Sequence, residues 1–210
     1  MVREMNAAAQ DPRVQRTKQQ LRQALVTLLK TETPKTISIQ TVTKLAGITR
    51  GTFYLHYDDK QDFMQATIQD LIDDFYQKVT FSQTTKPTCD QVNLQALFEY
   101  VEQKQQTFKV FHQNEATLAF KDRLTQEMRQ LLQAYIEVQF KEASQADQIE
   151  MSITADYLAG ASLVLVFKWI EDGLVYSPRY MAKILYQLVQ MPNVHFDLAQ
   201  FFIETQESID

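Results

Sequence analysis

Apolar residues recur at helical spacing through almost all of this 210-residue chain, and this periodicity is the strongest constraint on its fold. Leu21, Leu25 and Leu28, for example, lie four and three residues apart, as on one face of a helix. The chain holds only four glycines and five prolines, too few for the many turns of a β architecture. No segment shows a convincing strand pattern. We therefore predict an all-α protein.

Two short helices joined by a tight turn are predicted between residues 38 and 57. Ser38 is placed to cap the first, and Gly47 to end it in the left-handed conformation. Thr49 is placed to cap the second. A helix of residues 12–31 precedes this pair. The following helix, which starts after Asp58 or Asp59, is expected to connect the N-terminal module with the rest of the chain.

The second short helix carries a face too polar and aromatic for ordinary packing. A unit of this kind is a helix-turn-helix, which places its second helix in the major groove of DNA. Arg50 can pair with guanine, and Gly51 allows close approach of the backbone. Lys60 combines a positive charge with a helix N-terminus, so it is predicted to clamp a phosphate. The side chains expected to bond phosphates or contact a thymine methyl are Thr52, Tyr54 and His56.

Charge is distributed unevenly along the chain. The net charge is −5, which alone would argue against a nucleic-acid partner. Residues 1–60, however, hold ten Lys or Arg against five Asp or Glu, whereas residues 61–210 hold eleven against twenty-one. This asymmetry indicates a basic binding module attached to an acidic body.

The same residues carry a family resemblance. The run Leu-Ala-Gly-Ile-Thr-Arg-Gly-Thr-Phe-Tyr-Leu-His-Tyr at residues 45–57, followed by Lys60 and Phe63, resembles the TetR/AcrR family of transcriptional regulators. In that family an N-terminal three-helix module binds operator DNA, and a helical C-terminal domain dimerises and often binds a small effector. The match spans residues 13–75, with Tyr57 where phenylalanine is more frequent and Thr43 where alanine is usual. The residues that the resemblance implies at DNA are Ser38, Thr49, Arg50, Gly51, Thr52, Tyr54, His56 and Lys60.

The predicted domains are a DNA-binding domain of residues 12–60, a connecting helix of residues 61–81 and a C-terminal domain of residues 93–207. Ser82–Asn93 is predicted to be a loop. The helices expected after it lie near residues 93–106, 107–114, 117–142, 148–171, 178–190 and 195–207.

Aromatic and large apolar residues are frequent in the middle of the C-terminal domain. The resemblance makes an effector cavity in this region plausible, whereas core packing is the better expectation for any single residue. The expected effector-binding residues are Phe108, Phe111, His112, Phe120, Met128, Tyr135 and Trp169.

Small residues follow helical spacing in the predicted helix 148–171, and they allow two helices to approach closely. One interpretation is a buried helix of the chain's own core. The resemblance raises the other, a two-fold four-helix interface made by this helix and helix 178–190 of each subunit. The residues expected there are Ala155, Ala159, Ser162, Leu163, Val166, Tyr180 and Ile184.

The resemblance implies a homodimeric repressor that binds a palindromic double-stranded DNA operator and is released by a small effector. The alternative is a co-activator or adaptor of the same fold, regulated by a protein partner. No catalytic constellation, metal-ligand spacing or cofactor motif stands out, so we expect no enzyme. A single cysteine excludes an internal disulfide, and the apolar stretch Tyr157–Phe167 is too short for a membrane span. We expect a cytoplasmic protein without a membrane partner.

Overall fold

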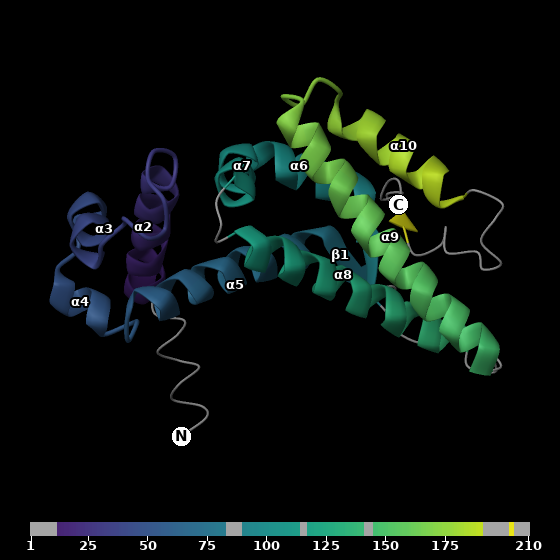
Figure 1. Ribbon diagram of the computed structural model, residues 1–210, viewed down its shortest axis with the longest axis horizontal. Helices are drawn as coiled ribbons and strands as arrows, with labels where there is room; N and C mark the ends of the chain where they lie inside the picture. The colour runs from purple at the N-terminus through teal and green to yellow at the C-terminus, as the bar shows by residue number, and fades with distance from the viewer. Residues whose placement is uncertain (1–11, 83–89, 114–116, 141–144, 191–201, 204–210) are drawn as a thin grey trace. The chain divides into compact units, whose positions relative to one another are not determined.

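The computed structural model describes residues 12–82, 90–113, 117–140, 145–190 and 202–203, and helices make up most of them (Figure 1). Within these ranges there are nine helices and three short strands. The prediction of an all-α fold is confirmed. The described residues form two compact units, with a boundary between Leu71 and Ile72 and with Gln113 and Thr117 grouped with the first.

The first unit contains α2 (Pro12–Leu28), α3 (Ile39–Ala46), α4 (Arg50–Tyr54) and the first half of α5 (Lys60–Val79). The predicted capping is confirmed. The backbone N–H of Thr41 donates to Ser38 Oγ, and that of Thr52 donates to Thr49 Oγ1. Gly47 ends α3 with φ of 67°, a conformation that glycine adopts without the steric cost of a Cβ. The helix-turn-helix therefore follows directly from local sequence signals.

The second unit contains the end of α5 and five further helices. These are α6 (Leu94–Gln103), α7 (Gln105–Gln113), α8 (Thr117–Gln139), α9 (Gln145–Glu171) and α10 (Pro178–Val189). Asn93 caps α6 by accepting from the Ala96 N–H, and Ser177 caps α10, with Pro178 at its first position. Each predicted helix between residues 93 and 190 is present, and its ends differ from the prediction by a few residues.

A small sheet contradicts the expectation that the chain has no strands. β1 (Thr80–Ser82) pairs antiparallel with β2 (Asp90–Asn93), and β2 pairs parallel with β3 (Phe202–Ile203). The predicted loop Ser82–Asn93 is therefore wrong at its ends, and the helix predicted over residues 195–207 is wrong at residues 202–203. Residues 83–89, 191–201 and 204–210 lie outside the described part of the chain. Strands of two to four residues are too short to show an alternating pattern, and the β2–β3 pairing joins distant segments.

Candidate nucleic-acid interface and the surfaces of the C-terminal unit

The inner face of α4 is locked by an aromatic cluster formed by Phe53, Tyr57 and Phe63. All three side chains are buried. The ring centroids lie 5.4 Å apart for Phe53 and Phe63, and 4.9 Å apart for Tyr57 and Phe63. Aromatic rings in tilted or edge-to-face contact at these distances stabilise the packing beyond the area they bury. The cluster therefore holds α4 firmly against the start of α5.

The outer face of α4 is exposed and carries the residues expected at DNA. Arg50 and Gly51 lie on the surface, and Tyr54 is 48% exposed. Thr52 and His56 are half-buried beside them. The structure thus brings these five residues onto one short segment whose position is set by the cluster beneath it.

Two predicted contacts, Ser38 and Thr49, have their hydroxyl groups engaged as helix caps. Ser38 Oγ also lies 2.8 Å from Thr41 Oγ1, and Thr49 Oγ1 lies 2.8 Å from Thr52 Oγ1. Both capping residues are exposed. Their hydroxyls orient the starts of α3 and α4, so any contact with DNA would be added to this structural role.

Gly51 has no packing reason to be glycine. A Cβ at this position would meet only Thr49 Oγ1, at 3.8 Å, which is ordinary van der Waals contact. Glycine in a helix costs about 0.5–1 kcal/mol relative to alanine. Within the described residues nothing offsets this cost, which is consistent with a surface that another molecule approaches closely.

Two exposed leucines of the module were not among the predicted site residues. Leu55, just after α4, is 80% exposed, and Leu45 on α3 is 51% exposed. Both lie close in sequence to the expected DNA contacts, and an apolar side chain can contact a thymine methyl. Leu55 lies two residues after the buried Phe53, on the other side of the helix, which is the signal that could have revealed it. Leu45 lies three residues after the buried Val42, so its spacing alone predicts an inward side chain.

Lys60, which was predicted to clamp a phosphate, has acceptors within its own chain. Its Nζ donates to the backbone carbonyls of Pro34, Lys35 and Ile37, at 3.1, 3.4 and 3.0 Å. The side chain is half-buried rather than solvated. The prediction considered only the charge and the helix start, whereas the acceptors come from the distant turn between α2 and α3.

Tyr57 brings a buried hydroxyl into the module. Its Oη has no hydrogen-bond partner among the described residues. Burial, followed by the nearby Asp70 carboxylate, raises the pKa of Tyr57 to about 12. Asp70 itself pairs with Arg22 at 3.1 Å, which ties α2 to α5. Thr43, the other departure from the family pattern, is buried and donates to the Ile39 carbonyl.

The residues expected to bind an effector form the core of the second unit instead of lining a cavity. Phe108 contacts Phe120 at 5.5 Å between ring centroids, and Trp169 contacts Phe98 at 5.3 Å while its Nε1 donates to the Tyr176 carbonyl. The members buried in this core are Phe108, Phe111, Phe120, Met128, Tyr135 and Trp169. Helical spacing is the same for residues of a filled core and for residues of a cavity wall. The sequence therefore could not distinguish an effector cavity from the core that the structure shows.

His112, the remaining expected effector residue, joins α7 to the end of α9. Its Nε2 lies 2.5 Å from Glu171 Oε1, and its ring stacks on Phe167 at 4.7 Å. The hydrogen bond from His112 holds the pKa of Glu171 below its usual value. His112 therefore has an intramolecular partner on α9.

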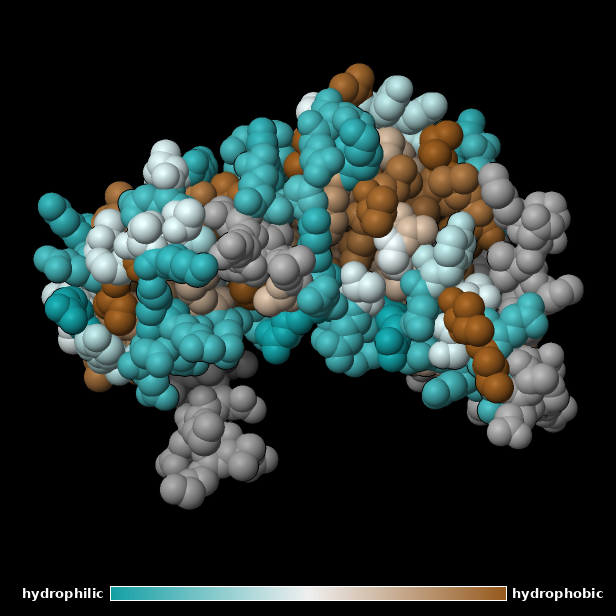
Figure 2. All heavy atoms as spheres, in the orientation of Figure 1, coloured by the Kyte–Doolittle hydropathy of each residue, from teal (hydrophilic) through white to brown (hydrophobic). Residues whose placement is uncertain are grey.

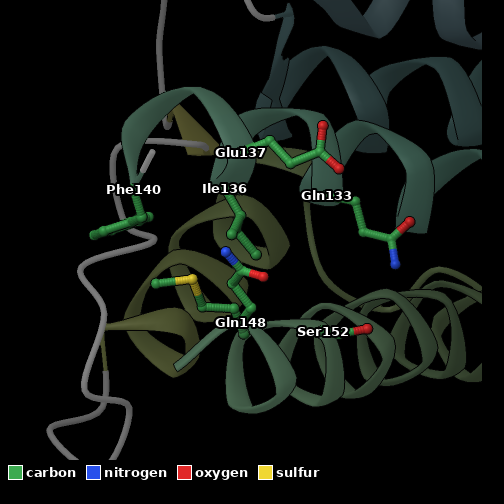
Figure 3. A pocket seen from close by; sticks show the side chains of 7 residues that line it. Gln133, Ile136, Glu137, Phe140, Gln148 and Ser152 are labelled. Atoms are coloured by element: carbon green, nitrogen blue, oxygen red, sulfur yellow. The ribbon is translucent and has the colours of Figure 1, made fainter. Parts of the chain in front are cut away.

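A pocket of about 510 Å³ lies elsewhere, between the end of α8 and the start of α9 (Figure 3). Ile136 and Gln148 face each other across it, and Gln133 and Glu137 lie along its α8 side. None of the seven expected effector residues lines it. Its mixed polar and apolar lining offers no specific group that identifies a ligand.

Five of the seven residues expected at the dimer interface are buried in the core of their own unit, whereas the neighbouring Gly160 is half-buried and Ala161 is exposed. The five that are buried within a single chain are Ala155, Ala159, Ser162, Leu163 and Val166. Tyr180 is exposed and Ile184 is half-buried. Large apolar residues lie on both the buried and the exposed side of α9, so sequence spacing alone did not show which side faces inward.

The opposite side of α9 is apolar and exposed. Figure 2 shows apolar side chains gathered over α9 and α10. We call this surface the α9–α10 face. Its large exposed members are Ile149, Ile153, Tyr157, Val164, Tyr180 and Leu188. Exposed apolar side chains gathered over neighbouring helices are typical of an interaction surface.

The sequence predicts that the stretch Tyr157–Phe167 is too short for a membrane span, but the longer segment Gln148–Glu171 is long and apolar enough to cross a membrane by length and composition alone. Half of its 18-residue apolar window is buried inside the unit. In the part of the chain that the structure describes, no group of three or more His, Cys, Asp or Glu could hold a metal ion.

Comparisons with known proteins find similarity to transcriptional regulators. Residues 90–191 match a TetR family model described as a transcriptional regulator C-terminal region. The chain is 25% identical to the uncharacterized HTH-type transcriptional regulator YxbF of Bacillus subtilis (strain 168), over 84% of this chain and 46% of that protein. The chain thus spans about half the length of this curated relative.

Solved structures show the same fold. The dihydroxyacetone kinase operon activator DhaS is similar with a TM-score of 0.57 and 18% identity, over 88% of this chain and 96% of that one. NalD, the secondary repressor of the MexAB-OprM multidrug efflux pump in Pseudomonas aeruginosa, is similar with a TM-score of 0.51 and 14% identity, over 82% and 95%. The solved structures show the fold, while the family model and the curated relative show that the chain is similar to TetR-type transcriptional regulators.

Proposed function

We propose that this regulator reads double-stranded operator DNA through the exposed face of α4. The observation that carries the proposal is the contrast between the two sides of that helix. The inner side is locked by the aromatic cluster, while the outer side presents Arg50, Tyr54 and an otherwise unexplained glycine, Gly51. Residues 12–60 would form the reading domain, residues 61–81 the connecting helix, and residues 93–207 the regulatory domain.

The active form would be a homodimer joined through the α9–α10 face. One short recognition helix binds weakly, so two copies related by a two-fold axis would read a palindromic operator, with half-sites about 34 Å or a multiple of that apart. An isologous interface uses the same patch on both subunits, and the α9–α10 face offers such a patch. Two residues that the sequence predicts at the dimer interface belong to α10: Tyr180 is an exposed member of this face, and Ile184 is half-buried.

The direction of regulation is proposed as repression relieved by a small effector, in a cytoplasmic protein. The fold does not choose the direction, because the similar structures include both an operon activator and a repressor. The filled aromatic core favours the second candidate, a co-activator or adaptor regulated by a protein partner. In either case the signal must bind one conformation more tightly than the other.

DNA binding is tested by an electrophoretic shift with the DNA upstream of the protein's own gene. The double variant Arg50→Ala, Tyr54→Ala should lose specific binding. It removes the guanidinium proposed to bond a guanine edge, together with the neighbouring tyrosine hydroxyl. Arg123→Ala, which removes an exposed arginine of α8, is the matched control and should bind as the wild type does. Retained affinity and specificity in the double variant would refute the residue assignment.

The two modes of regulation are separated by a thermal-shift screen of small molecules on the purified protein. A compound that raises the melting temperature and also releases DNA supports the effector hypothesis, because a ligand of the native state stabilises it. A screen without such a compound, together with stoichiometric co-purification of one protein that alters DNA binding, supports the adaptor hypothesis.

A further inference from the structure

The ammonium group of Lys60 sits among three backbone carbonyls of one turn. The acceptors are the carbonyls of Pro34, Lys35 and Ile37, at 3.1, 3.4 and 3.0 Å from Nζ. They lie 23 to 26 residues before Lys60 in the sequence. The contact is therefore tertiary, and it joins the first residue of α5 to the connection between α2 and α3.

The chemistry of this contact uses the whole ammonium group. A lysine ammonium has three N–H donors and no acceptor, and three carbonyls surround it here. The same turn is closed by the N–H groups of Thr36 and Ile37, which both donate to the Thr33 carbonyl. Hydrogen bonds from a charged donor are stronger than those between neutral groups. Lys60 therefore links three carbonyls of the turn to one another through its ammonium group, and it also joins the turn to α5.

The turn leads directly into the reading helices. Ile37 is buried, and Ser38, the next residue, caps α3. At the other end of the helix pair, Phe53 and Tyr57 pack on Phe63 of α5. The helix-turn-helix is thus attached to α5 at its entrance by Lys60 and at its exit by the aromatic cluster.

We propose that Lys60 is a positioning residue for DNA recognition, which sets the orientation of α3 and α4 on α5 rather than contacting a phosphate. The inference rests on the proposed function, since orientation matters only if α4 reads DNA. It makes a distinct prediction about salt. Each phosphate contact by a lysine contributes about one to the slope of log affinity against log salt, whereas an intramolecular clamp contributes nothing to it.

The test compares Lys60→Met with Lys44→Met in the full chain. Lys44 is an exposed lysine on α3, so its variant reports the loss of the same charge without loss of the clamp. We expect Lys60→Met to lower the melting temperature by several degrees and to weaken operator binding about tenfold, at a temperature where it is folded, with an unchanged salt slope. Lys44→Met should melt as the wild type does.

Lys60→Arg keeps the proposal testable if Lys60→Met does not fold. Arginine is a good phosphate ligand, but the N–H groups of its guanidinium lie in one plane. It therefore cannot direct three donors from one nitrogen to three surrounding carbonyls, as an ammonium does. The arginine variant should therefore melt below the wild type and bind more weakly with the same salt slope. Wild-type melting in Lys60→Met, a slope lowered by about one, or full rescue by arginine would overturn the proposal. The melting temperatures require no DNA, so failure of the wild type to bind DNA would refute the proposed function separately.

Discussion

Two adjacent residues of α9, the buried Leu163 and the exposed Val164, provide a direct test of the dimer proposal. Leu163 is 3% exposed in a single chain, while Val164 is 69% exposed. Truncation of each to alanine should therefore affect different equilibria. Val164→Ala should weaken association of the subunits, whereas Leu163→Ala should destabilise each subunit.

The magnitude for Val164→Ala follows from its exposure. The change removes two methyl groups, each worth about 0.8 kcal/mol when fully buried. Scaled by the exposed 69%, the loss is about 1 kcal/mol per subunit and about 2 kcal/mol per dimer, because a two-fold interface contains the site twice. The dissociation constant should rise roughly 30-fold. Leu163→Ala instead leaves a cavity in the core and should cost about 2–5 kcal/mol of unfolding free energy.

Sedimentation equilibrium over a range of protein concentrations gives the dissociation constant, and urea unfolding at one fixed concentration gives the free energy of unfolding. Both are needed because dimerisation adds to apparent stability. The reasoning fails if Leu163→Ala raises the dissociation constant while Val164→Ala leaves it unchanged, because that result would place the interface on the side of the small residues. A monomeric wild type would remove the interface altogether.

Three further predictions concern single residues. Tyr57→Phe should raise the free energy of unfolding by about 1 kcal/mol, because it removes a buried hydroxyl without a hydrogen-bond partner among the described residues; urea unfolding that shows a loss of stability would contradict this. Gly51→Ala should stabilise α4 by about 0.5–1 kcal/mol while weakening DNA binding in a gel shift, and unchanged affinity would show that nothing approaches this glycine closely. The pKa of Glu171 is lowered by the hydrogen bond from His112, so its contribution to stability is complete above the ordinary value of 4.5 and is lost as the pH falls below it. The free energy of unfolding, measured between about pH 5 and 3, should therefore depend less steeply on pH in Glu171→Gln than in the wild type. Equal pH dependence in the two proteins would show that the hydrogen bond from His112 to Glu171 does not contribute to stability.

The features that the sequence predicts well are those encoded within a few residues. The caps at Ser38 and Thr49 and the left-handed Gly47 are local signals, and the structure places all three as expected. The helix-turn-helix could be predicted for the same reason. Lys60 shows the limit, because its acceptors lie on a turn more than twenty residues earlier. A charge at a helix start is compatible with a phosphate contact or an internal clamp, and only the tertiary arrangement separates them.

The C-terminal unit shows a different limit. Large apolar residues lie on both the buried and the exposed side of α9, so helical spacing does not show which face is buried, and Ala155, Ala159 and Ser162 proved to face inward. The aromatic set around Phe108 had the same ambiguity between a filled core and a cavity wall. The sheet was missed because the pairing of Val92 with Phe202 depends on a distant segment.

α5 is shared by the two units. Its first half belongs to the first unit, where Lys60, Phe63 and Asp70 attach the turn, α4 and α2 to it. Its second half belongs to the second unit, where Tyr76 Oη donates to the Leu124 carbonyl at 2.7 Å. Three separate attachments therefore join the reading module to the start of α5. A ligand or partner that displaces the end of α5 would therefore be expected to redirect the whole module rather than to distort α4.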